Sequence, residues 1–263
     1  MTVKTDQILA AVKTKTPLVQ CITNYVAMNI AANVVLAAGA SPAMVHAETE
    51  VSDFVQISSA LTINIGTLSP NWVVAMQKAA DAANASGTPW VLDPVAHFAT
   101  SYRSEVVKDL IARKPTIIRG NASEILALSG AATAGKGADS GDRVSDAESA
   151  ATALAKLHVC IVAVTGEVDF VTDGIRAARI SGGSDFMPMI TAMGCSLTAL
   201  VGAFVSVAPP LEATVAALAM FSEAGTRAGL TATGPGSFQV AFLDALSQIK
   251  PVDLADDAGV QWL

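Results

Sequence analysis

Apolar residues recur along this chain with two spacings, and the alternation of the two predicts its fold. Short runs rich in β-branched residues are typical of buried strands, whereas apolar positions three and four residues apart are typical of helices. The predicted strands lie at 42–46, 61–65, 90–93, 116–119 and 160–164, followed by a hairpin around Asp173 and Gly174. The predicted helices lie at 8–13, 24–38, 70–86, 103–113, 145–157, 194–207, 211–229 and 237–248, and Asn121 or Ser123 caps one more that ends at 129.

Strands that alternate with helices predict a mostly parallel central sheet with helices on both faces, which is a three-layer α/β/α fold. No composition break or internal repeat divides the sequence, so we expect a single domain over residues 1–263. Small polar residues and glycines at 130–142 predict an exposed loop. Its first part, 130–137, nearly spells a phosphate-binding P-loop, but it lacks the Ser or Thr that would hold Mg²⁺ and follows a helix, so we reject that interpretation.

Charge and composition limit the possible partners. The chain is 52% hydrophobic with a formal net charge of −7, so a basic face for nucleic acid is not expected. Three stretches have no charged residue, at 16–47, 54–77 and 186–211, but each is interrupted by proline and none has a flank rich in Lys or Arg. We therefore expect no membrane partner. Three cysteines and no apolar signal segment are typical of a cytoplasmic protein.

Polar residues cluster where three predicted strands end. Asp93 ends one strand, Arg119 ends the next, and Thr165 and Gly166 follow a third. Because ligands of parallel sheets gather outside the carboxyl ends of the strands, we expect these residues to share one crevice. A cation, with backbone amides at Gly120 and Gly166 that we expect to be exposed, suits the phosphates of a nucleotide.

Two carboxylates beside this crevice predict a metal site. Glu124 lies one helical turn beyond Asn121, so its carboxylate is expected to point back toward the same strand end. Asp93 and Glu124 are therefore predicted to hold Mg²⁺ through water, because this ion keeps several waters in protein sites. For each acid alone, a helix cap or a solvated turn is the alternative.

The second predicted centre opens the apolar helix at 194–207. Backbone N–H groups at a helix N-terminus, with the helix dipole, form a site for an anion such as a transferring phosphoryl group. Cys195 lies in the first turn, where the same field is expected to lower the pKa of its thiol. The alternative is an inert, buried cysteine.

Eight segments, in order over almost the whole chain, carry a family resemblance. They read CITNYVAMNIAAN, GASPAMVHA, LTINIGTLSP, VLDPV, IIRGNASEI, VAVTGEVD, TAMGC and GPGSF. These segments resemble the hydroxyethylthiazole kinase family. The resemblance implies the ribokinase-like fold and the ATP- and Mg²⁺-dependent phosphorylation of 5-(2-hydroxyethyl)-4-methylthiazole on its primary alcohol, for thiamine biosynthesis or salvage. It also implies a homotrimer with active sites between subunits.

The resemblance implies roles for individual residues as well. Met44 and Asn24 resemble residues that contact the thiazole, and Ala192 resembles one that offers its backbone amide to the substrate. Arg119 and Thr165 resemble residues that contact ATP.

Three further positions match residues that the family uses in catalysis. Asn121 and Glu124 match the Asn-x-x-Glu motif that the resemblance ties to Mg²⁺. Cys195 lies where most ribokinase-like kinases have the Asp that takes the proton from the attacking hydroxyl, so we hypothesise that it orients the alcohol and assists proton removal. The chain departs from the family at Ala192 and Met193, where the family often has glycine followed by Thr or Ser. Alanine restricts φ where glycine does not, so the geometry of this loop is expected to differ.

Three other functions compete with this interpretation. One is a related small-alcohol kinase, such as a hydroxymethylpyrimidine or pyridoxal kinase, although Cys195 and the CITNYV segment argue against it. A non-catalytic sensor of the thiazole is another, supported only by the departure at 192–193. A cysteine hydrolase is the third, but no motif places His46, His97 or His158 to activate Cys195.

Overall fold

The structure, a computed structural model, describes residues 4–131, 143–257 and 259–263. Most of the loop predicted at 130–142, with its P-loop-like sequence, therefore lies outside the described residues. The described ranges contain a nine-stranded sheet in the order β2-β1-β3-β4-β5-β6-β7-β8-β9. Its strands are β1 (Leu18–Ile22), β2 (Ser41–Ala43), β3 (Ala60–Asn64), β4 (Trp90–Asp93), β5 (Ile117–Asn121), β6 (Ile161–Thr165), β7 (Val168–Thr172), β8 (Ala177–Ser181) and β9 (Val260–Trp262).

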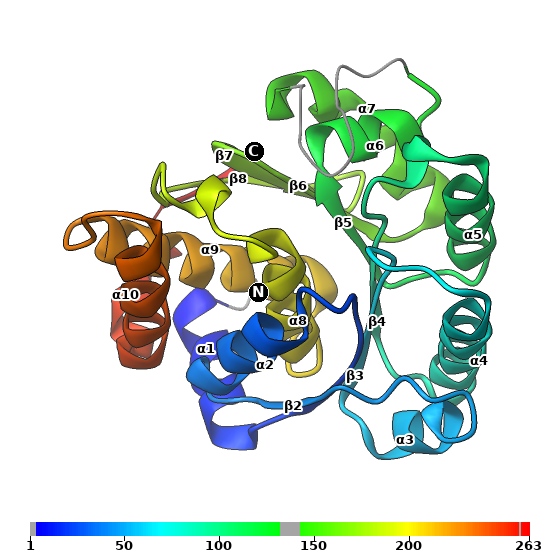
Figure 1. Cartoon of the computed structure of the whole chain (residues 1–263). Helices are drawn as coiled ribbons and strands as arrows, with labels where there is room; N and C mark the ends of the chain where they lie inside the picture. The colour runs from blue at the N-terminus through cyan, green and yellow to red at the C-terminus, as the bar shows by residue number, and fades with distance from the viewer. Residues whose placement is uncertain (1–3, 132–142, 258) are drawn as a thin grey trace.

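The sheet is parallel from β2 to β6 and antiparallel from there to β9. Helices cover both of its faces (Figure 1). One side carries α1 (Thr5–Lys15), α2 (Met28–Ala37), α8 (Met193–Val205), α9 (Pro210–Gly229) and α10 (Pro235–Gln248). The other side carries α3 (Val51–Ile57), α4 (Pro70–Ser86), α5 (Ser101–Ala112), α6 (Ala122–Leu128) and α7 (Val144–His158). The predicted three-layer α/β/α fold is confirmed.

Apolar burial on both faces holds the layers together. The largest cluster lies on the side of α8 and α9, two helices whose residues are mostly buried. Two smaller clusters lie on the other side, one under α3, α4 and α5 and one under α6 and α7. Burial of α8 on all sides explains the charge-free stretch at 186–211, because a helix that is apolar all round belongs in a core. No helix in the described ranges is both long enough and apolar enough to cross a membrane.

Several elements follow directly from local sequence signals. Helix α4 begins where Ser69 accepts a hydrogen bond from the amide of Trp72 and ends at Gly87, which has φ 72°. The Asp-Gly pair gives the predicted hairpin between β7 and β8, with Gly174 at φ 90°. These matches are expected, because caps and tight turns are read from a few neighbouring residues.

Other elements depart from the prediction. The pattern assigns no strand to β1 or β9 and no helix to α3, because none of these short segments shows a clear apolar period. Helix α2 begins at Met28 instead of residue 24, because Asn24 Oδ1 accepts the amide of Ala27 and makes a turn there. Strand β2 ends at Ala43, so Met44 follows the strand instead of lying within it.

The strand order reverses at β1, which has β2 on one side and β3 on the other. The chain leaves β1 toward α2 on one face of the sheet and leaves β3 toward α4 on the other (Figure 1). Such a reversal opens a crevice at the carboxyl ends of the strands. Asn24 follows β1 and Asn64 ends β3, so both lie at this crevice.

Candidate active site

A cavity of about 880 Å³ lies at the carboxyl ends of β4, β5 and β6, between the β6–β7 turn and the first turn of α8. The lining includes eight of the ten residues singled out from the sequence: Asp93, Arg119, Asn121, Glu124, Thr165, Gly166, Ala192 and Cys195. The prediction that these strand ends share one crevice is confirmed. The segment at 187–191 between β8 and α8 lines the same cavity from above the sheet.

Met44 and Asn24 do not line the cavity. Met44 is half-buried and packs on the main core cluster, so its predicted contact with a substrate remains a prediction. Asn24 is buried, and its side-chain amide donates to Cys195 Sγ at 3.3 Å and to Asn64 Oδ1 at 2.9 Å. Asn24 therefore touches the site through Cys195.

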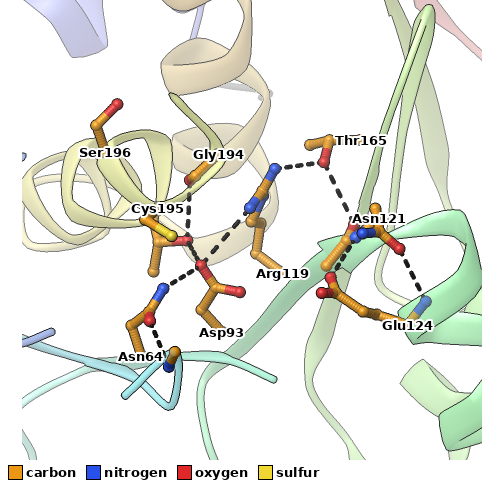
Figure 2. Close-up of polar contacts among 12 residues, drawn as sticks. Asn64, Asp93, Arg119, Asn121, Glu124, Thr165, Gly194, Cys195 and Ser196 are labelled. Atoms are coloured by element: carbon orange, nitrogen blue, oxygen red, sulfur yellow. Dashed lines mark hydrogen bonds and ion pairs between the residues drawn. The ribbon is translucent and has the colours of Figure 1, made fainter. Parts of the chain in front are cut away.

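Asp93 is the centre of the polar network in Figure 2. Its Oδ2 accepts hydrogen bonds from Asn64 Nδ2 and Thr198 Oγ1, both at 2.7 Å, and lies 3.6 Å from the Arg119 guanidinium. Its Oδ1 is buried and accepts no hydrogen bond from the described residues. Burial raises the pKa of Asp93, although Arg119 opposes that shift. One carboxylate oxygen is thus held by three protein groups, and the other is left for a ligand.

The Arg119 side chain crosses from β5 to the start of α8. Its guanidinium donates to Thr165 Oγ1 and packs so closely on Gly194 that a Cβ there would lie 2.7 Å from Nη1. A larger residue at 194 would displace the guanidinium, so glycine lets the cation lie against the N-terminus of α8. The cation and the amides of this helix end converge on one place, which is an arrangement suited to a phosphoryl group.

Glu124 is both a helix cap and a cavity residue. Asn121 Oδ1 accepts the amide of Glu124, and the carboxylate of Glu124 accepts the amide of Asn121 at 2.8 Å, a capping box at the start of α6. The other carboxylate oxygen accepts the amide of Ala96 at 2.9 Å. Burial and the like charge of Asp93 raise the pKa of Glu124 to about 7. The capping alternative considered from the sequence is therefore correct in part, because capping and exposure to the cavity coexist.

The donor set fits a divalent cation. Asp93 and Glu124 line the same cavity and repel each other, and Asp93 Oδ1 is a buried anionic oxygen without a donor. A hard cation such as Mg²⁺ prefers one or two carboxylates supplemented by water and phosphate oxygens. No group of three or more His, Cys, Asp or Glu among the described residues could hold a metal without such additional ligands.

Local geometry corrects two expectations about backbone amides. Gly120 is buried within β5, and its amide is not exposed. The N–H of Gly166 donates to Asp169 Oδ1 at 2.9 Å, so the β6–β7 turn holds this amide itself. Exposure of a glycine in a turn does not make its N–H available when a nearby acid accepts it.

The expected low pKa of Cys195 is wrong. Cys195 lies in the first turn of α8, but burial and the nearby charge of Asp93 raise the pKa of its thiol to about 11. Desolvation of a thiolate and repulsion from a carboxylate outweigh the helix dipole here. At neutral pH the side chain is a thiol.

A cysteine-hydrolase site is not assembled. None of the three described histidines hydrogen-bonds Cys195. His97 Nε2 hydrogen-bonds the carbonyl of Glu124 at 3.0 Å, and the ring of His46 lies tilted against Trp72. Cys195 Sγ is hydrogen-bonded to Asn24. Without a base beside the thiol, nucleophilic catalysis has no support in the described residues.

Comparison with known proteins places this site in a family. The model of the hydroxyethylthiazole kinase family matches residues 9–251. A hydroxyethylthiazole kinase from Gemmatimonas aurantiaca is 60% identical over 254 residues, which are 97% of this chain and 92% of that protein. The chain belongs to the hydroxyethylthiazole kinase family. Its activity is accordingly hydroxyethylthiazole kinase activity, in thiamine biosynthesis.

Solved structures agree with this assignment. The structure of a hydroxyethylthiazole kinase protein from Pyrococcus horikoshii has a TM-score of 0.90 at 38% identity, over 98% of both chains. A ribokinase-like superfamily protein from Enterococcus faecalis has a TM-score of 0.68 at 10% identity, over 95% of this chain and 96% of that one. The second likeness shows the fold alone, which is ribokinase-like.

The departure from the family sequence at Ala192 has a structural consequence. Ala192 is the N-cap of α8 and has φ 60° and ψ 21°, the left-handed conformation that glycine adopts without strain. Ala192 therefore places its Cβ in a conformation that is disfavoured for alanine.

Sequence reasoning missed four residues that shape this hydroxyethylthiazole kinase site. They are Asn64, Arg103, Asp169 and Thr198. Asn64 and Asp169 had a usable signal, because Asn64 ends a strand and Asp169 follows Gly166 closely. Arg103 and Thr198 lie within helices at positions that look ordinary in the sequence, so only the tertiary structure reveals them.

Proposed function

We propose that this kinase transfers the γ-phosphoryl group of ATP, in the presence of Mg²⁺, to the primary alcohol of 5-(2-hydroxyethyl)-4-methylthiazole. The alcohol oxygen forms a bond to the γ-phosphorus, the bond from that phosphorus to the β-γ bridging oxygen breaks, and the alcohol proton is released. The observation that carries this proposal is the convergence of Asp93, Arg119 and the N-terminus of α8 on one cavity. Phosphoryl transfer depends chiefly on positioning and charge stabilisation, which this geometry supplies.

The nucleotide is proposed to lie over β5 and β6. Arg119 and Thr165 are hydrogen-bonded to each other and line the cavity, so both can face its phosphates. Gly166 lines the next part of the wall. Its amide is already used by Asp169, and a Cβ at this position would lie 2.6 Å from Val144 Cγ2, so glycine lets the turn pack against α7.

Asp93 and Glu124 are proposed to hold Mg²⁺, the first through its unpartnered Oδ1 and the second through water, with Asn121 orienting Glu124 by the capping box. When bound, the ion supplies neutralisation of the charge that develops on the phosphate oxygens. In its absence, the two carboxylates are held in place by Asn64, Thr198 and backbone amides.

Cys195 is proposed to orient the alcohol as a neutral thiol. Its raised pKa argues against a thiolate base at neutral pH, which narrows the hypothesis drawn from the sequence. Replacement of Cys195 by Ala should lower kcat less than about tenfold and leave the pH profile between 6 and 9 unchanged in shape, because no proton acceptor is removed. A drop of about 100-fold or more with loss of a basic limb in the kcat profile would restore the base role.

The acceptor side is proposed to be shared between copies of the chain. Ala192 lines the cavity, whereas Met44 does not and packs on the main core cluster. Beside Asn24, the side chains of Tyr25 and Val26 are 66% and 63% exposed, which fits a covered surface in an oligomer. We propose a homotrimer in which Met44 of one subunit completes the thiazole pocket of the next.

Mixed oligomers test this arrangement. Variants M44R and D93N should each be inactive alone, one through a blocked pocket and one through a lost charge. Co-expressed, they should regain part of the wild-type activity, since some sites then contain a native Met44 and a native Asp93 from different subunits. Sites built within one chain would give no such recovery, and sedimentation would report the oligomeric state independently.

The direct test of the reaction is coupled detection of ADP release. With ATP and Mg²⁺, the thiazole alcohol should be turned over, and hydroxymethylpyrimidine and pyridoxal should be much poorer substrates. Measurable thiazole binding without ADP release would favour the sensor alternative. We further propose that residues 1–263 act as one kinase domain in the cytoplasm, which the nine-stranded sheet and the unpaired cysteines support.

A further inference from the structure

Asp169 is a buried acid at the nucleotide end of the cavity. It lies on β7 with 9% of its surface exposed, and it lines the cavity. Its Oδ1 accepts the amide of Gly166, and no described residue donates to its Oδ2. Oδ2 is open to the cavity, so a ligand there can donate a hydrogen bond to it.

The surrounding charges make a phosphate an unsuitable neighbour for this oxygen. Glu167 and Asp185 line the same cavity, and Arg119 is the cation whose charge reaches Asp169. The guanidinium of Arg119 is already directed to Asp93 and Thr165. An additional anion beside Asp169 would meet like charge, so its partner is expected to be a neutral group with an O–H or N–H.

The position of Asp169 along the cavity selects the donor. Contacts lead from the reacting end toward Asp169: Gly194 packs on Arg119, Arg119 donates to Thr165, and the amide of the next residue, Gly166, donates to Asp169. A nucleotide with its γ-phosphate at the N-terminus of α8 has its ribose next after the phosphates. The amino group of adenine lies farther along.

We propose that the free oxygen of Asp169 accepts a hydrogen bond from a ribose hydroxyl of the nucleotide and so selects ribonucleotides over deoxynucleotides. This inference rests on the proposed function, because it requires a nucleotide in this cavity. The two carboxylate oxygens then have different partners: Oδ1 accepts the amide of Gly166, and Oδ2 accepts the ribose hydroxyl. Glu167, which is exposed in the same turn, has neither contact.

Binding of ADP, 2′-deoxy-ADP and 3′-deoxy-ADP in the presence of Mg²⁺, measured by calorimetry, tests the proposal. The wild-type protein should bind one of the deoxy analogues about tenfold more weakly than ADP, because hydrogen bonds to a charged acceptor are the strong ones. D169N can still accept the Gly166 amide through its side-chain oxygen and should lose that discrimination. E167Q removes a charge from the same turn and should keep it.

The outcomes separate the two proposals. Equal binding of all three nucleotides by the wild-type protein would overturn the role of Asp169, and so would discrimination that persists in D169N. If the wild-type protein binds no ADP at all, the proposed nucleotide site itself fails. The first readout needs no variant, so the test stands even where D169N is unstable.

Discussion

The two ends of the cavity differ in how their polar groups are satisfied. At the end formed by β4, β5 and α8, buried Asp93 is paired with Arg119 and accepts hydrogen bonds from Asn64 and Thr198, which lie behind the cavity wall. At the end formed by the β6–β7 turn and the segment after β8, glycines line an open wall, and the buried acid Asp169 has one oxygen without a donor.

This difference indicates where the protein is preorganised and where the ligand completes it. Buried charges are stable only when paired or hydrogen-bonded, so the reacting end is fixed before any ligand arrives. Fixed dipoles and charges also stabilise developing charge without reorganisation. The nucleotide end needs no such precision, and a missing donor there can come from the ligand.

The largest predicted effect concerns Asp93. In D93N the side-chain oxygen can keep the hydrogen bonds from Asn64 and Thr198, while the anionic Oδ1 is replaced by an amide. We expect kcat to fall by about 100-fold to 1000-fold and the melting temperature to fall as well, because buried Arg119 loses its ion-pair partner. Steady-state kinetics measures kcat, and thermal unfolding measures the melting temperature. A folded D93N with more than about a tenth of wild-type kcat would contradict a preorganised charge at this end.

A smaller effect is predicted for Arg103, which holds the reacting end from outside the cavity. Its guanidinium donates to the carbonyls of Ile65, Gly66 and Val95, and so ties together the loops that follow Asn64 and Asp93. R103M should lower kcat about tenfold and leave KM for ATP within about twofold, because the nucleotide residues on β6 are untouched. R103K, with its single ammonium, should recover only part of kcat.

Arg113 provides a matched control, because it is the C-cap of α5, the helix that contains Arg103. It pairs with Asp81 and Asp109 at the surface. R113M should therefore change stability slightly and kcat hardly at all. If R103M loses stability but keeps wild-type kcat well below its melting temperature, Arg103 is merely structural and the contrast between the two arginines disappears.

The pH dependence of stability should show the strain between the two carboxylates. The pKa of Glu124 is raised to about 7 in the folded protein, above its ordinary value of 4.5. Between those values the folded state keeps a proton that the unfolded state has lost, so this group makes stability fall as pH rises from about 5 to 7. The pKa of buried His97 is lowered, so this group makes stability rise with pH. The contribution of Glu124 is therefore isolated by comparing the wild-type protein with a variant.

We therefore compare the free energy of unfolding of the wild-type protein with that of D93N at each pH. Removing the like charge should lower the pKa of Glu124 in the variant and flatten its share of the pH dependence by on the order of 1 kcal/mol. Urea unfolding of the metal-free proteins at pH 5, 6, 7 and 8 measures it. Parallel curves for the two proteins would show that the carboxylates do not interact.

The smallest predicted effect concerns the start of α8. Ala192 has φ 60°, so A192G should relieve left-handed strain of about 1 kcal/mol and lose part of that gain to the greater freedom of glycine in the unfolded chain. Val159, an exposed C-cap with φ 52°, is the control: V159G should relieve the same strain without any effect on kcat. Destabilisation by A192G, seen in urea unfolding, would show that the loop is not strained by its alanine.

Much of the site could be predicted from the sequence because it depends on strand ends. Asp93, Arg119 and Thr165 each end or closely follow a strand with a clear apolar pattern, and a parallel sheet brings such ends together. Glu124 was placed correctly for a similar reason, as a capping box is set by residues three apart. The separation of Met44 from the cavity was not predictable, since it depends on where the short strand β2 ends.

The sequence by itself determined the alternation of strands and helices, the caps and hairpin, and the chemical types of the residues at the cavity. These depend on periodicity and on contacts between near neighbours. Only the tertiary structure decided the charge states, namely the neutral thiol of Cys195 and the raised pKa of Glu124 beside Asp93. It also decided the hydrogen bonds of Arg103 to two loops and of Asp169 to Gly166. Desolvation and long-range hydrogen bonds depend on which distant segments are brought together, and the local pattern does not contain that information.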